Sequence, residues 1–600
     1  MSILPSLDHP RRSRRWPLVA VVSAALMLAV GLWAGGSQAA TGTTAASTSS
    51  AAIAPAISCS SASGIDLLAL SGANTEITSA TPVAAASNPA GDWAACEVQG
   101  IIVPETHFTL YLPTSTYAGE YLQEGCGGGC GSVNVSTPTA SSGCAQTTDG
   151  DFAVAADDEG HEGGGFAVMA FQDPEMRAVF GYSSEHQLAL VSKAIIKAFY
   201  GTAPADSYYD GCSDGGREAL TEAQRYPTDF NGIIAGSPAS IQTELNAFEE
   251  AWNAQANTAA DGTAILTSAD LTPLHNDVLE ACGGATAETL GYLADPLACD
   301  WQPSSIECKS GQTSSSTDFC LTAAQVETVD KLYDGVRDPQ GQLLYPGYEL
   351  RGSELNWAGW IVPTNGDEES TTTDANIATT AWQSWVTPTG TFDGTANYMD
   401  VQFTKAVFDK VTAANDGELD ATDPNLSAFE KAGGKLILWA GYADPAINPA
   451  GTISYYQAVL KTMGGLSATE QFAKLFLLPG VAHCGGGQGP SNMDAVTAIT
   501  DWVTKGDSPS SLLTSLTDST GTVTATRPVY AYPDIAVDTT GGSIYSAASY
   551  TPEVSKAEEN LNIQWLGSFR SGYETVSGWV NGQWVTRPAN LGSGSGSGLG

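Results

Sequence analysis

The sequence predicts an α/β fold, in which short strands alternate with helices along the chain. The segment 186–200 carries apolar residues at helical spacing, and a strand-like run at 207–209 is followed by strong helix formers at 217–225. This alternation stops between about 240 and 427 and returns from residue 435, which indicates one sheet interrupted by a long insertion. We interpret 92–112 as containing the early strands, and 152–156, 166–170, 435–439 and 474–478 as further strands. Further helices are expected at 452–463 and 494–505.

The turn between the strand at 207–209 and the following helix carries a possible nucleophile. Gly211-Cys212-Ser213-Asp214-Gly215 fits the pattern G-x-S-x-G. Flanking glycines let a strand turn sharply into a helix and leave the serine hydroxyl exposed, and the N–H of Asp214 would then point where an oxyanion forms. The alternative is a glycine-rich loop with a solvated serine, because a chain with 65 glycines among 600 residues can produce this pattern by chance.

A nucleophilic serine needs a base, and the base needs a carboxylate that orients it. Only His275 and His483 follow Ser213, and His483 comes just after an apolar strand and a Pro-Gly turn, whereas His275 lies in a polar, helix-like stretch. Asp444 also follows a strand, so the chain order is Ser, Asp, His, as in α/β-hydrolases. All three residues lie past the carboxyl ends of strands, where open α/β sheets bind ligands. The alternatives are an Asp-Pro turn and a loop histidine.

Two cysteines adjoin these candidates. Cys212 precedes Ser213 and Cys484 follows His483, so a hydrogen bond between the serine and the histidine would bring the cysteines together. A disulfide needs Cα atoms about 4.4–6.8 Å apart, which such neighbours can meet. The bridge would span 484 − 212 = 272 positions, contribute on the order of 5 kcal/mol through chain entropy, and hold base and nucleophile together.

A glycine cluster lies between the early strands at 92–112 and the nucleophile turn. Residues 125–131 read Gly-Cys-Gly-Gly-Gly-Cys-Gly. In α/β-hydrolases the second oxyanion donor lies in such a loop after an early strand, and glycine lets the backbone approach a substrate closely. We expect the donor to be the N–H of Gly127 or Gly128; the alternative is an ordinary turn.

The arrangement of Cys212-Ser213, Asp444 and His483-Cys484 closely resembles the tannase and feruloyl esterase family. That family includes tannases, feruloyl esterases and a bacterial mono(hydroxyethyl) terephthalate hydrolase. The resemblance runs from about Cys59 to about Trp565. Further segments similar to the family are 158–161, 166–168, 181–186 and 226–239.

The resemblance implies a secreted serine carboxylic-ester hydrolase of α/β-hydrolase fold with an inserted lid. Ser213 would attack the ester, His483 would be the base, and Asp444 would orient it, through an acyl-enzyme and without a cofactor. The implied substrate is an aromatic ester, a gallate or a hydroxycinnamate such as ferulate, including plant cell-wall and tannin esters, or else a terephthalate monoester. Two rivals are a non-catalytic carbohydrate or cell-wall binding protein on a hydrolase fold, and a peptidase.

The resemblance also implies disulfides and, in the lid, a metal site. Its bridges are Cys59–Cys96, Cys212–Cys484, Cys282–Cys299 and Cys308–Cys320. Cys126, Cys130 and Cys144 remain, which allows one further bridge and one free thiol without choosing among them. A metal site from Cys126 and Cys130 would need a third and a fourth ligand nearby.

Three departures from the family pattern stand out. Many members bind calcium in a lid loop between two cysteines, but here residues 282–295 keep only Glu288 and Asp295, so we expect this site to be lost or weakened. Ala440 replaces a usual histidine, and Tyr530 replaces a cysteine of a late disulfide. We interpret two histidines before the nucleophile, His161 and His186, as structural.

The lid carries tryptophans that suit an aromatic substrate, although most of them are expected to form the core of the lid itself. They are Trp301, Trp357, Trp360, Trp382 and Trp385. The expected organisation is 1–40 signal peptide, 41–58 flexible leader, 59–240 first part of the hydrolase core, 241–427 lid, 428–590 second part of the core, and 591–600 disordered Gly/Ser tail.

Composition and the N-terminus limit the function class. The net charge is −41, with 24 basic and 65 acidic residues, which excludes nucleic acid as a partner. Four arginines at 11–15, an apolar run at 17–33 and the small residues 37–39 are typical of a signal peptide. An uncleaved membrane anchor is the alternative. Eleven cysteines agree with an extracellular or periplasmic protein that has no stable membrane association once the signal is cleaved.

Overall fold

The structure is a computed structural model that describes residues 52–67, 74–136, 138, 140–163, 173–315, 318–384, 386, 394–415, 417–555, 557, 565–569, 575–580 and 583–588. The expected signal peptide, most of the leader, the strand at 166–170, Trp385 and the tail at 591–600 lie outside these residues. Among the described helices, none combines the length and the apolar character needed to cross a membrane.

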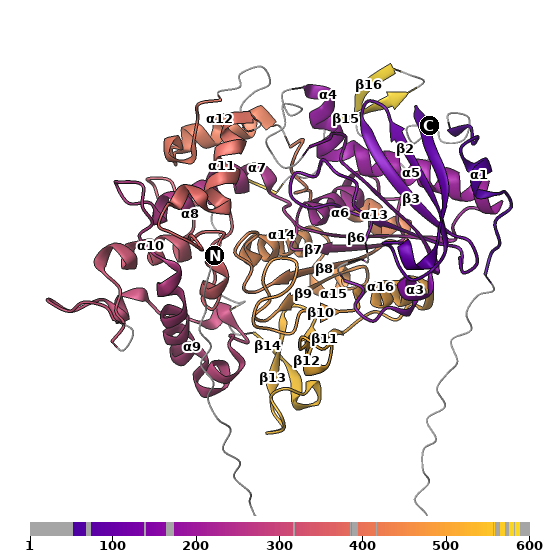
Figure 1. The fold of residues 1–600 in the computed structure, drawn as a ribbon. Helices are drawn as coiled ribbons and strands as arrows, with labels where there is room; N and C mark the ends of the chain where they lie inside the picture. Colours follow the sequence, from indigo (N-terminus) through magenta and orange to yellow (C-terminus); the bar gives the residue numbers. More distant parts are fainter. Residues whose placement is uncertain are drawn as a thin grey trace, which may run out of the picture. The chain divides into compact units, whose positions relative to one another are not determined.

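A nine-stranded mixed sheet forms the centre of the fold (Figure 1). Its order is β1-β2-β3-β5-β4-β6-β7-β8-β9, and the strands from β5 to β9 run parallel while β1, β2 and β3 pair antiparallel. The strands are β1 Thr75–Val83, β2 Ala95–Ile102, β3 Thr106–Pro113, β4 Glu120–Glu124, β5 Phe152–Asp157, β6 Asp206–Cys212, β7 Gly232–Gly236, β8 Lys435–Gly441 and β9 Ala473–Leu478.

Helices cover both faces of this sheet, which is why its parallel strands are apolar on both sides. In β8, Leu436 and Leu438 pack on the face covered by α5, α6 and α14, whereas Ile437 and Trp439 pack on the face covered by α16. The covering helices are α5 Ser184–Tyr200, α6 Asp214–Arg225, α14 Pro449–Thr462 and α16 Ala495–Lys505. The helices and strands predicted in these segments are therefore confirmed.

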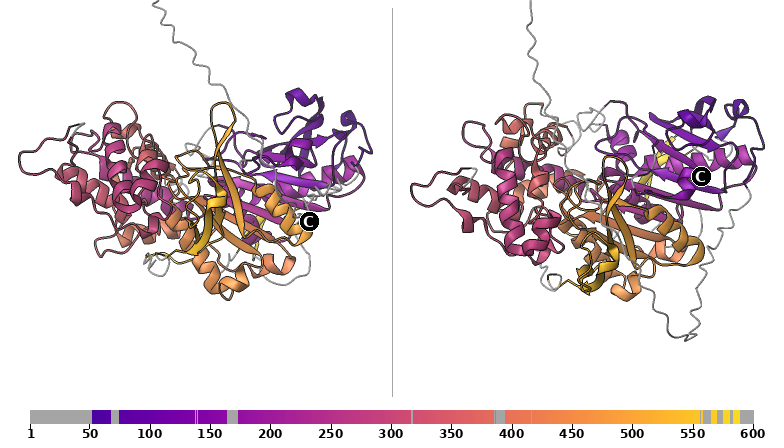
Figure 2. Two further views of the ribbon diagram at one scale, coloured as in Figure 1. Left: turned by 90° about the horizontal axis from the view of Figure 1, so that it is seen from below. Right: turned by 60° about the horizontal axis from the view of Figure 1, so that its bottom comes forward.

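Between β7 and β8 the described chain forms helices and no strand. Most of these helices lie together as a group (Figures 1 and 2), whereas the last of them, Ser427–Ala432, packs against α6 beside the central sheet. Trp301 and Trp357 are buried in an apolar cluster within this helical insertion, as expected for most of its tryptophans. Whether the insertion acts as a lid remains a prediction. Its helices are α7 Gln242–Glu244, α8 Glu250–Asn257, α9 Ser268–Leu290, α10 Ala323–Asp334, α11 Thr373–Ser384, α12 Lys405–Asn415 and α13 Ser427–Ala432.

The last part of the described chain adds small sheets that the sequence pattern did not predict. Strand β11 pairs with β10 and β12, and β13 pairs with β14. Much of β14 is exposed, so these strands lack a strong apolar alternation. The strands are β10 Asn492–Met493, β11 Ser511–Thr517, β12 Val523–Tyr530, β13 Asp534–Asp538, β14 Tyr550–Val554, β15 Thr575–Val580 and β16 Gln583–Pro588, and the remaining short helices of five or fewer residues are α1 Cys59–Ala62, α3 Ala145–Asp149, α4 Pro174–Ala178 and α15 Leu466–Thr469.

Ten of the eleven cysteines form disulfides, and all eleven lie in the described residues. The structure pairs Cys126 with Cys130 and leaves Cys144 as a buried thiol, which resolves the choice that the sequence left open. The other bridges are Cys59–Cys96, Cys212–Cys484, Cys282–Cys299 and Cys308–Cys320.

Many carboxyl groups are buried in the fold without a cationic partner. Burial raises the pKa of Asp157 to about 8, of Asp210 and Glu249 to about 7, and of Glu369 to about 8. In the unfolded chain such groups have pKa values near 4. The contribution of these four groups to the free energy of unfolding is therefore most favourable below about pH 4, where they are neutral in both states, and it is lost as the pH rises from about 4 to about 8.

Glu369 provides a test of this pH dependence. Its carboxylate is fully buried (0% exposed) and accepts a hydrogen bond from Asn257 Nδ2 at 2.8 Å, whereas its neighbour Glu368 is exposed. We expect the wild-type midpoint of thermal unfolding to fall between pH 5 and pH 8. The substitution Glu369→Gln should recover on the order of 2 kcal/mol at pH 8 and little at pH 5, because the amide cannot ionise.

The matched control is Glu368→Gln, which should follow the wild-type pH profile. Differential scanning calorimetry of the three proteins at both pH values is the measurement. A fall for Glu369→Gln as steep as that of the wild type would show that this buried carboxyl does not contribute to the loss of stability.

Candidate active site

Ser213 lies in a tight turn between the end of β6 and the start of α6. Its backbone has φ +67° and ψ −120°, a conformation that side-chain-bearing residues rarely adopt. A Cβ on Gly211 would lie 2.3 Å from the carbonyl oxygen of Gly215, and a Cβ on Gly215 would lie 2.8 Å from that of Cys126. Glycine at both positions therefore lets strand, helix and the neighbouring loop meet at the serine. The motif is a strand–turn–helix and not a solvated loop.

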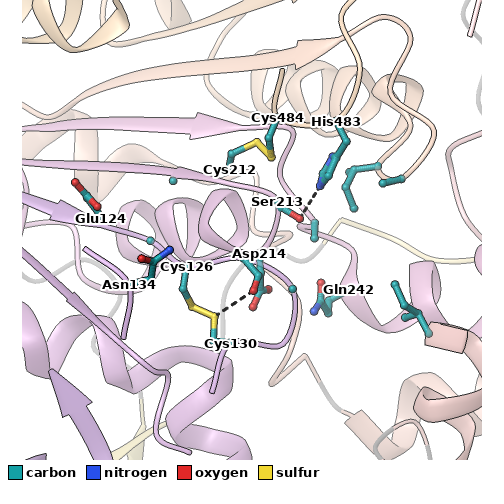
Figure 3. Close-up of a pocket in the computed structure, with 18 of the residues that line it drawn as sticks. Glu124, Cys126, Cys130, Asn134, Cys212, Ser213, Asp214, Gln242, His483 and Cys484 are labelled. Carbon is teal, nitrogen blue, oxygen red and sulfur yellow. Dashed lines mark hydrogen bonds between the residues drawn. A yellow bond between two sulfur atoms is a disulfide. The ribbon is translucent and has the colours of Figure 1, made fainter. Parts of the chain in front are cut away.

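The structure brings Ser213, His483 and Asp444 into one hydrogen-bonded chain. His483 Nε2 lies 2.8 Å from Ser213 Oγ, and His483 Nδ1 lies 2.9 Å from Asp444 Oδ2. The other carboxylate oxygen of Asp444 accepts the backbone N–H groups of Ala446 and Ile447 at 2.9 and 3.0 Å. These bonds fix the buried carboxylate, and the carboxylate in turn orients the imidazole toward the serine. Figure 3 shows His483 directed at Ser213.

The other downstream histidine lies elsewhere. His275 is buried in α9, where Nδ1 lies 2.7 Å from Glu354 Oε2 and Nε2 lies 3.1 Å from the carbonyl oxygen of Gly291. Of the two upstream histidines that we interpret as structural, His161 is buried beside the ring of Phe180, and His186 lies 2.5 Å from Asp229 and stacks on the ring of Tyr226. None of these three side chains lines the cleft described below.

The Cys212–Cys484 bridge joins the residue before the serine to the residue after the histidine. The two Cα atoms lie 5.9 Å apart, and Figure 3 shows the bridge next to the Ser213–His483 pair. The bridge links the last residue of β6 to the loop after β9. The whole insertion lies between these two segments in the sequence. The bridge therefore limits how far the histidine can move from the serine.

The three residues expected to form the oxyanion hole line the same cleft as Ser213. Asp214 is the first residue of α6, so its N–H has no acceptor inside the helix. Gly127 and Gly128 belong to the loop after β4, which is attached to α6 by a bond from Gly215 N to the carbonyl oxygen of Cys126 at 2.7 Å. Within the described part of the chain, no protein acceptor is found for the N–H of Asp214, Gly127 or Gly128. The geometry does not choose between the two glycines.

Arg217 is a site residue that the sequence analysis missed. It is buried on the first turns of α6, where Nε donates to Asp214 Oδ1 at 2.5 Å and Nη2 donates to Glu159 Oε1 at 2.7 Å. It also donates to the carbonyl oxygens of Gly181 and Phe180. The available signal was an arginine about one helical turn after the nucleophile, together with the acidic segment at 158–159. These two segments are far apart in the sequence.

A cleft of about 510 Å³ opens at Ser213 and extends in two directions. Figure 3 shows Glu124 and Asn134 on one side of the serine and Gln242 on the other. The side of Glu124 is mainly polar, and the side of Gln242 combines apolar and polar groups from the insertion and from the loop after β8. The first group is Glu124, Ser132, Asn134, Ser136 and Asp210, and the second is Gln242, Leu245, Asn246, Glu250, Trp360, Ile377, Ala446 and Ile447.

Three features of the second group determine what it can bind. The ring of Trp360 meets His483 edge to face at 5.6 Å between centroids, so it forms a wall beside the serine. Gln242 Nε2 is buried without an acceptor among the described residues. Burial, followed by the charges of Asp374 and Glu249, holds the pKa of Glu250 well above its usual value. No lysine or arginine is among the described residues that line the cleft.

The residues present do not fit the calcium site of the family. Glu288 is exposed on α9, and Asp295 Oδ2 accepts a hydrogen bond from Ser555 Oγ at 2.8 Å. Two such carboxylates fall short of the six to eight oxygen ligands that calcium takes. The loss or weakening of this calcium site stays a prediction, and the two remaining carboxylates agree with it.

The alternative of a metal site at Cys126 and Cys130 finds two nearby carboxylates. Potential ligand atoms of these cysteines, Glu159 and Glu218 lie within 4.8 Å of one another. The two sulfur atoms are joined in a disulfide, however, so neither is a free thiolate that could bind a metal.

Comparisons with known proteins extend over most of the chain. An uncharacterized esterase of Xanthomonas campestris pv. campestris is 30% identical over 542 residues, covering 82% of this chain and 91% of the relative. The mono(2-hydroxyethyl) terephthalate hydrolase of Piscinibacter sakaiensis is 28% identical over 521 residues, covering 76% and 84%. A probable feruloyl esterase of Arthroderma benhamiae is 30% identical over 390 residues, covering 62% and 68%.

Solved structures show the same fold. Feruloyl esterase B from Aspergillus oryzae superposes with a TM-score of 0.70 at 24% identity, covering 83% of this chain and all of that one. Tannin acyl hydrolase from Aspergillus niger gives a TM-score of 0.62 at 20% identity, covering 81% and 91%. The central sheet with helices on both faces is thus an α/β-hydrolase fold. Because the profile of the tannase and feruloyl esterase family matches residues 92–552, this chain belongs to that family of carboxylic ester hydrolases.

Proposed function

We propose that this protein is a serine esterase that hydrolyses esters of phenolic aromatic acids, such as hydroxycinnamates or gallates, through an acyl-enzyme. The observation that carries the proposal is the hydrogen-bonded chain from Ser213 through His483 to Asp444 at the floor of a cleft. A serine activated in this way needs no cofactor, because proton transfer and charge stabilisation come from side chains and backbone.

The reaction follows from the positions of these groups. Ser213 Oγ attacks the ester carbonyl while His483 Nε2 takes its proton, and Asp444 stabilises the imidazolium that forms. The N–H of Asp214 and that of Gly127 or Gly128 bind the oxyanion. The tetrahedral adduct collapses as His483 protonates the leaving alcohol. Water, activated by the same histidine, then attacks the acyl-enzyme and releases the acid.

The insertion side of the cleft fits a phenolic ring. Trp360, Ile377 and Ile447 supply aromatic and aliphatic walls, which favour a flat apolar group. Gln242 Nε2 offers a buried donor without a partner in the described chain, and the neutral carboxyl of Glu250 can donate or accept. Ring hydroxyl groups match these polar atoms.

The charge of the cleft favours a neutral phenol over a terephthalate monoester. A terephthalate monoester carries a free carboxylate, which needs a cation or several donors when it is bound. The described lining residues include no lysine or arginine, so a bound carboxylate would find no cation among them. Terephthalate hydrolysis, named for one relative, is therefore the second candidate.

The site of action is extracellular or periplasmic in this proposal. Five disulfides form and persist in an oxidising compartment. The partner is a small aromatic ester, free or attached to plant cell wall or tannin. The surplus of 65 acidic over 24 basic residues disfavours nucleic acid, as the composition indicates.

Removal of the nucleophile tests the esterase proposal. With the mature, oxidised protein, we expect release of ferulate or gallate from the methyl esters, measured by liquid chromatography. Ser213→Ala should lower kcat by at least about 10⁴-fold, because no other group can form the acyl-enzyme. The control Ser508→Ala changes an exposed serine after α16 and should leave both rates unchanged.

The same assay separates the rival functions. A folded wild-type protein that cleaves neither methyl ester but cleaves mono(2-hydroxyethyl) terephthalate would replace the phenolic assignment by the second candidate. Cleavage of a chromogenic peptide alone would point to a peptidase. No cleavage of any of these substrates would favour the binding-protein rival.

Trp360 tests which side of the cleft holds the acyl group. Trp360→Leu removes the aromatic wall and should raise KM for methyl ferulate about tenfold relative to methyl butyrate, since aromatic pairs contribute roughly 0.5–1.5 kcal/mol. Steady-state kinetics with both esters give this ratio. Trp382→Leu, a change in the insertion that does not line the cleft, should leave the ratio unchanged. Equal ratios for all three proteins would place the ring elsewhere.

A further inference from the structure

The loop after β4 has few contacts of its own. An ideal Cβ on Gly127 or on Gly128 would meet no atom within 4 Å, so these two residues face open space. The loop is anchored at its ends, where Gly215 N donates to the carbonyl oxygen of Cys126 at 2.7 Å and Gly131 N donates to that of Asp158 at 3.1 Å. Between these anchors, side chains do not hold the backbone in place.

A disulfide closes this loop. Cys126 and Cys130 enclose the three glycines, and their Cα atoms lie 5.9 Å apart. Glycine has more conformational freedom than any other residue, so three of them in a row are costly to order. The cross-link removes open conformations of the loop and thereby positions the N–H groups of Gly127 and Gly128.

The bridge is accessible from the active-site cleft. Both cysteines line the cleft, and Cys126 is only half-buried. Figure 3 shows this bridge beside Asp214, apart from the Cys212–Cys484 bridge. Of the five bridges, only these two contribute to the lining among the described residues.

A buried acid lies against the sulfur atoms of this bridge. Glu218 Oε1 lies 3.1 Å from Cys126 Sγ and 3.9 Å from Cys130 Sγ, while Oε2 accepts hydrogen bonds from Tyr209 Oη and Cys126 N. Burial, followed by the charge of Asp214, raises the pKa of Glu218 to about 7. The carboxyl therefore carries a proton in mildly acidic solution, and the proposed esterase mechanism does not use it.

We propose that Cys126–Cys130, with Glu218 beside it, is a redox centre that controls the esterase by fixing or releasing the loop of Gly127 and Gly128. The proposal rests on the proposed function, because it assigns the oxyanion contact to that loop. The two cysteines act on the oxyanion contact through the loop and are therefore positioning residues, and Glu218 supplies the proton of the exchange. A small dithiol is the class of reductant that fits the cleft.

The thiol–disulfide exchange needs only the dithiol and the proton of Glu218. One thiolate of the dithiol attacks the half-buried sulfur of Cys126, the S–S bond breaks, and the electron pair goes to Cys130 Sγ, which takes the proton of Glu218. The second thiol of the reductant then attacks its own sulfur in the mixed disulfide and releases Cys126 as a thiol. The dithiol leaves as a cyclic disulfide, and the proton from its first thiol returns to Glu218 through solvent. Two electrons and two protons reach the cysteines.

The experiment combines activity with chemical mapping on the full, oxidised protein. Dithiothreitol is titrated with a chelator present, samples are alkylated with iodoacetamide, and the modified cysteines are identified by mass spectrometry. We expect Cys126 and Cys130 to be alkylated before the other bridged cysteines. In the same range kcat for methyl ferulate or gallate should fall roughly 10–100-fold, with KM within about twofold, because the loop acts on the transition state.

A transition-state analogue distinguishes positioning from general damage. Benzeneboronic acid forms a tetrahedral adduct with a serine, so its affinity should fall in parallel with kcat, whereas the thermal midpoint should stay within a few degrees. Reoxidation should restore both. The double variant Cys126→Ser/Cys130→Ser should have the low kcat from the start and no further response to the same dose of dithiothreitol.

Two single variants complete the test. Cys144→Ala removes the buried free thiol and should respond like the wild type. Glu218→Gln should slow the alkylation of Cys126 and Cys130 about tenfold at pH 6, because the amide cannot supply the proton. If the double variant does not fold, the affinity of the reduced wild-type protein for benzeneboronic acid still tests whether the loop positions the oxyanion contact.

Three outcomes would overturn the proposal. They are reduction of Cys126–Cys130 with kcat unchanged within twofold, loss of activity that coincides with alkylation of Cys212 and Cys484, and a wild-type reduction rate for Glu218→Gln. Failure of the esterase assignment is seen separately, as absence of ester cleavage by the oxidised protein. In that case the alkylation order and the effect of Glu218→Gln still test the redox centre.

Discussion

The buried guanidinium of Arg217 is the interaction on which the catalytic edge of the sheet depends. It is one cation between Asp214 and Glu159, and it also holds the carbonyl oxygens of Phe180 and Gly181. The helix that begins at Asp214, the loop after β5 and the turn before α5 therefore meet at one charge. A buried charge that loses its partners is costly, so these three segments are coupled. The orientation of the first turn of α6, and with it the N–H beside Ser213, follows from this contact.

Two disulfides restrain the same region of the site as the ion pairs of Arg217. Cys212–Cys484 limits the distance between nucleophile and base, and Cys126–Cys130 closes the glycine loop opposite them. The strained backbone at Ser213 is thus surrounded by two disulfides and one buried ion-pair network. Such a site keeps its geometry while the cleft beside it stays open to substrate, which is the condition for preorganised oxyanion stabilisation.

The sequence predicted those parts of the site that are formed by residues close together in the chain. It did not predict contacts between residues that only the fold brings together. Ser213 and its turn are encoded in five consecutive residues, and the chain order after strands, together with the family resemblance, pointed to Asp444 and His483. The pairing of Cys126 with Cys130 depends on a backbone turn at Cys130, with φ +36°, while Cys144 faces Thr497 of α16. Neither fact has a signal in the sequence. The same holds for the contact of Arg217 with Glu159, and for Trp360 being the insertion tryptophan beside His483.

The buried neutral carboxyls make unfolding a source of protons. Near pH 6 these groups are protonated in the folded protein and largely ionised in the unfolded chain, so each molecule that unfolds acidifies its surroundings. The buffer takes up these protons and contributes its own heat of ionisation to the measured enthalpy. In a concentrated, weakly buffered solution of the protein, partial unfolding would therefore lower the local pH, and the lower pH would in turn favour the folded form.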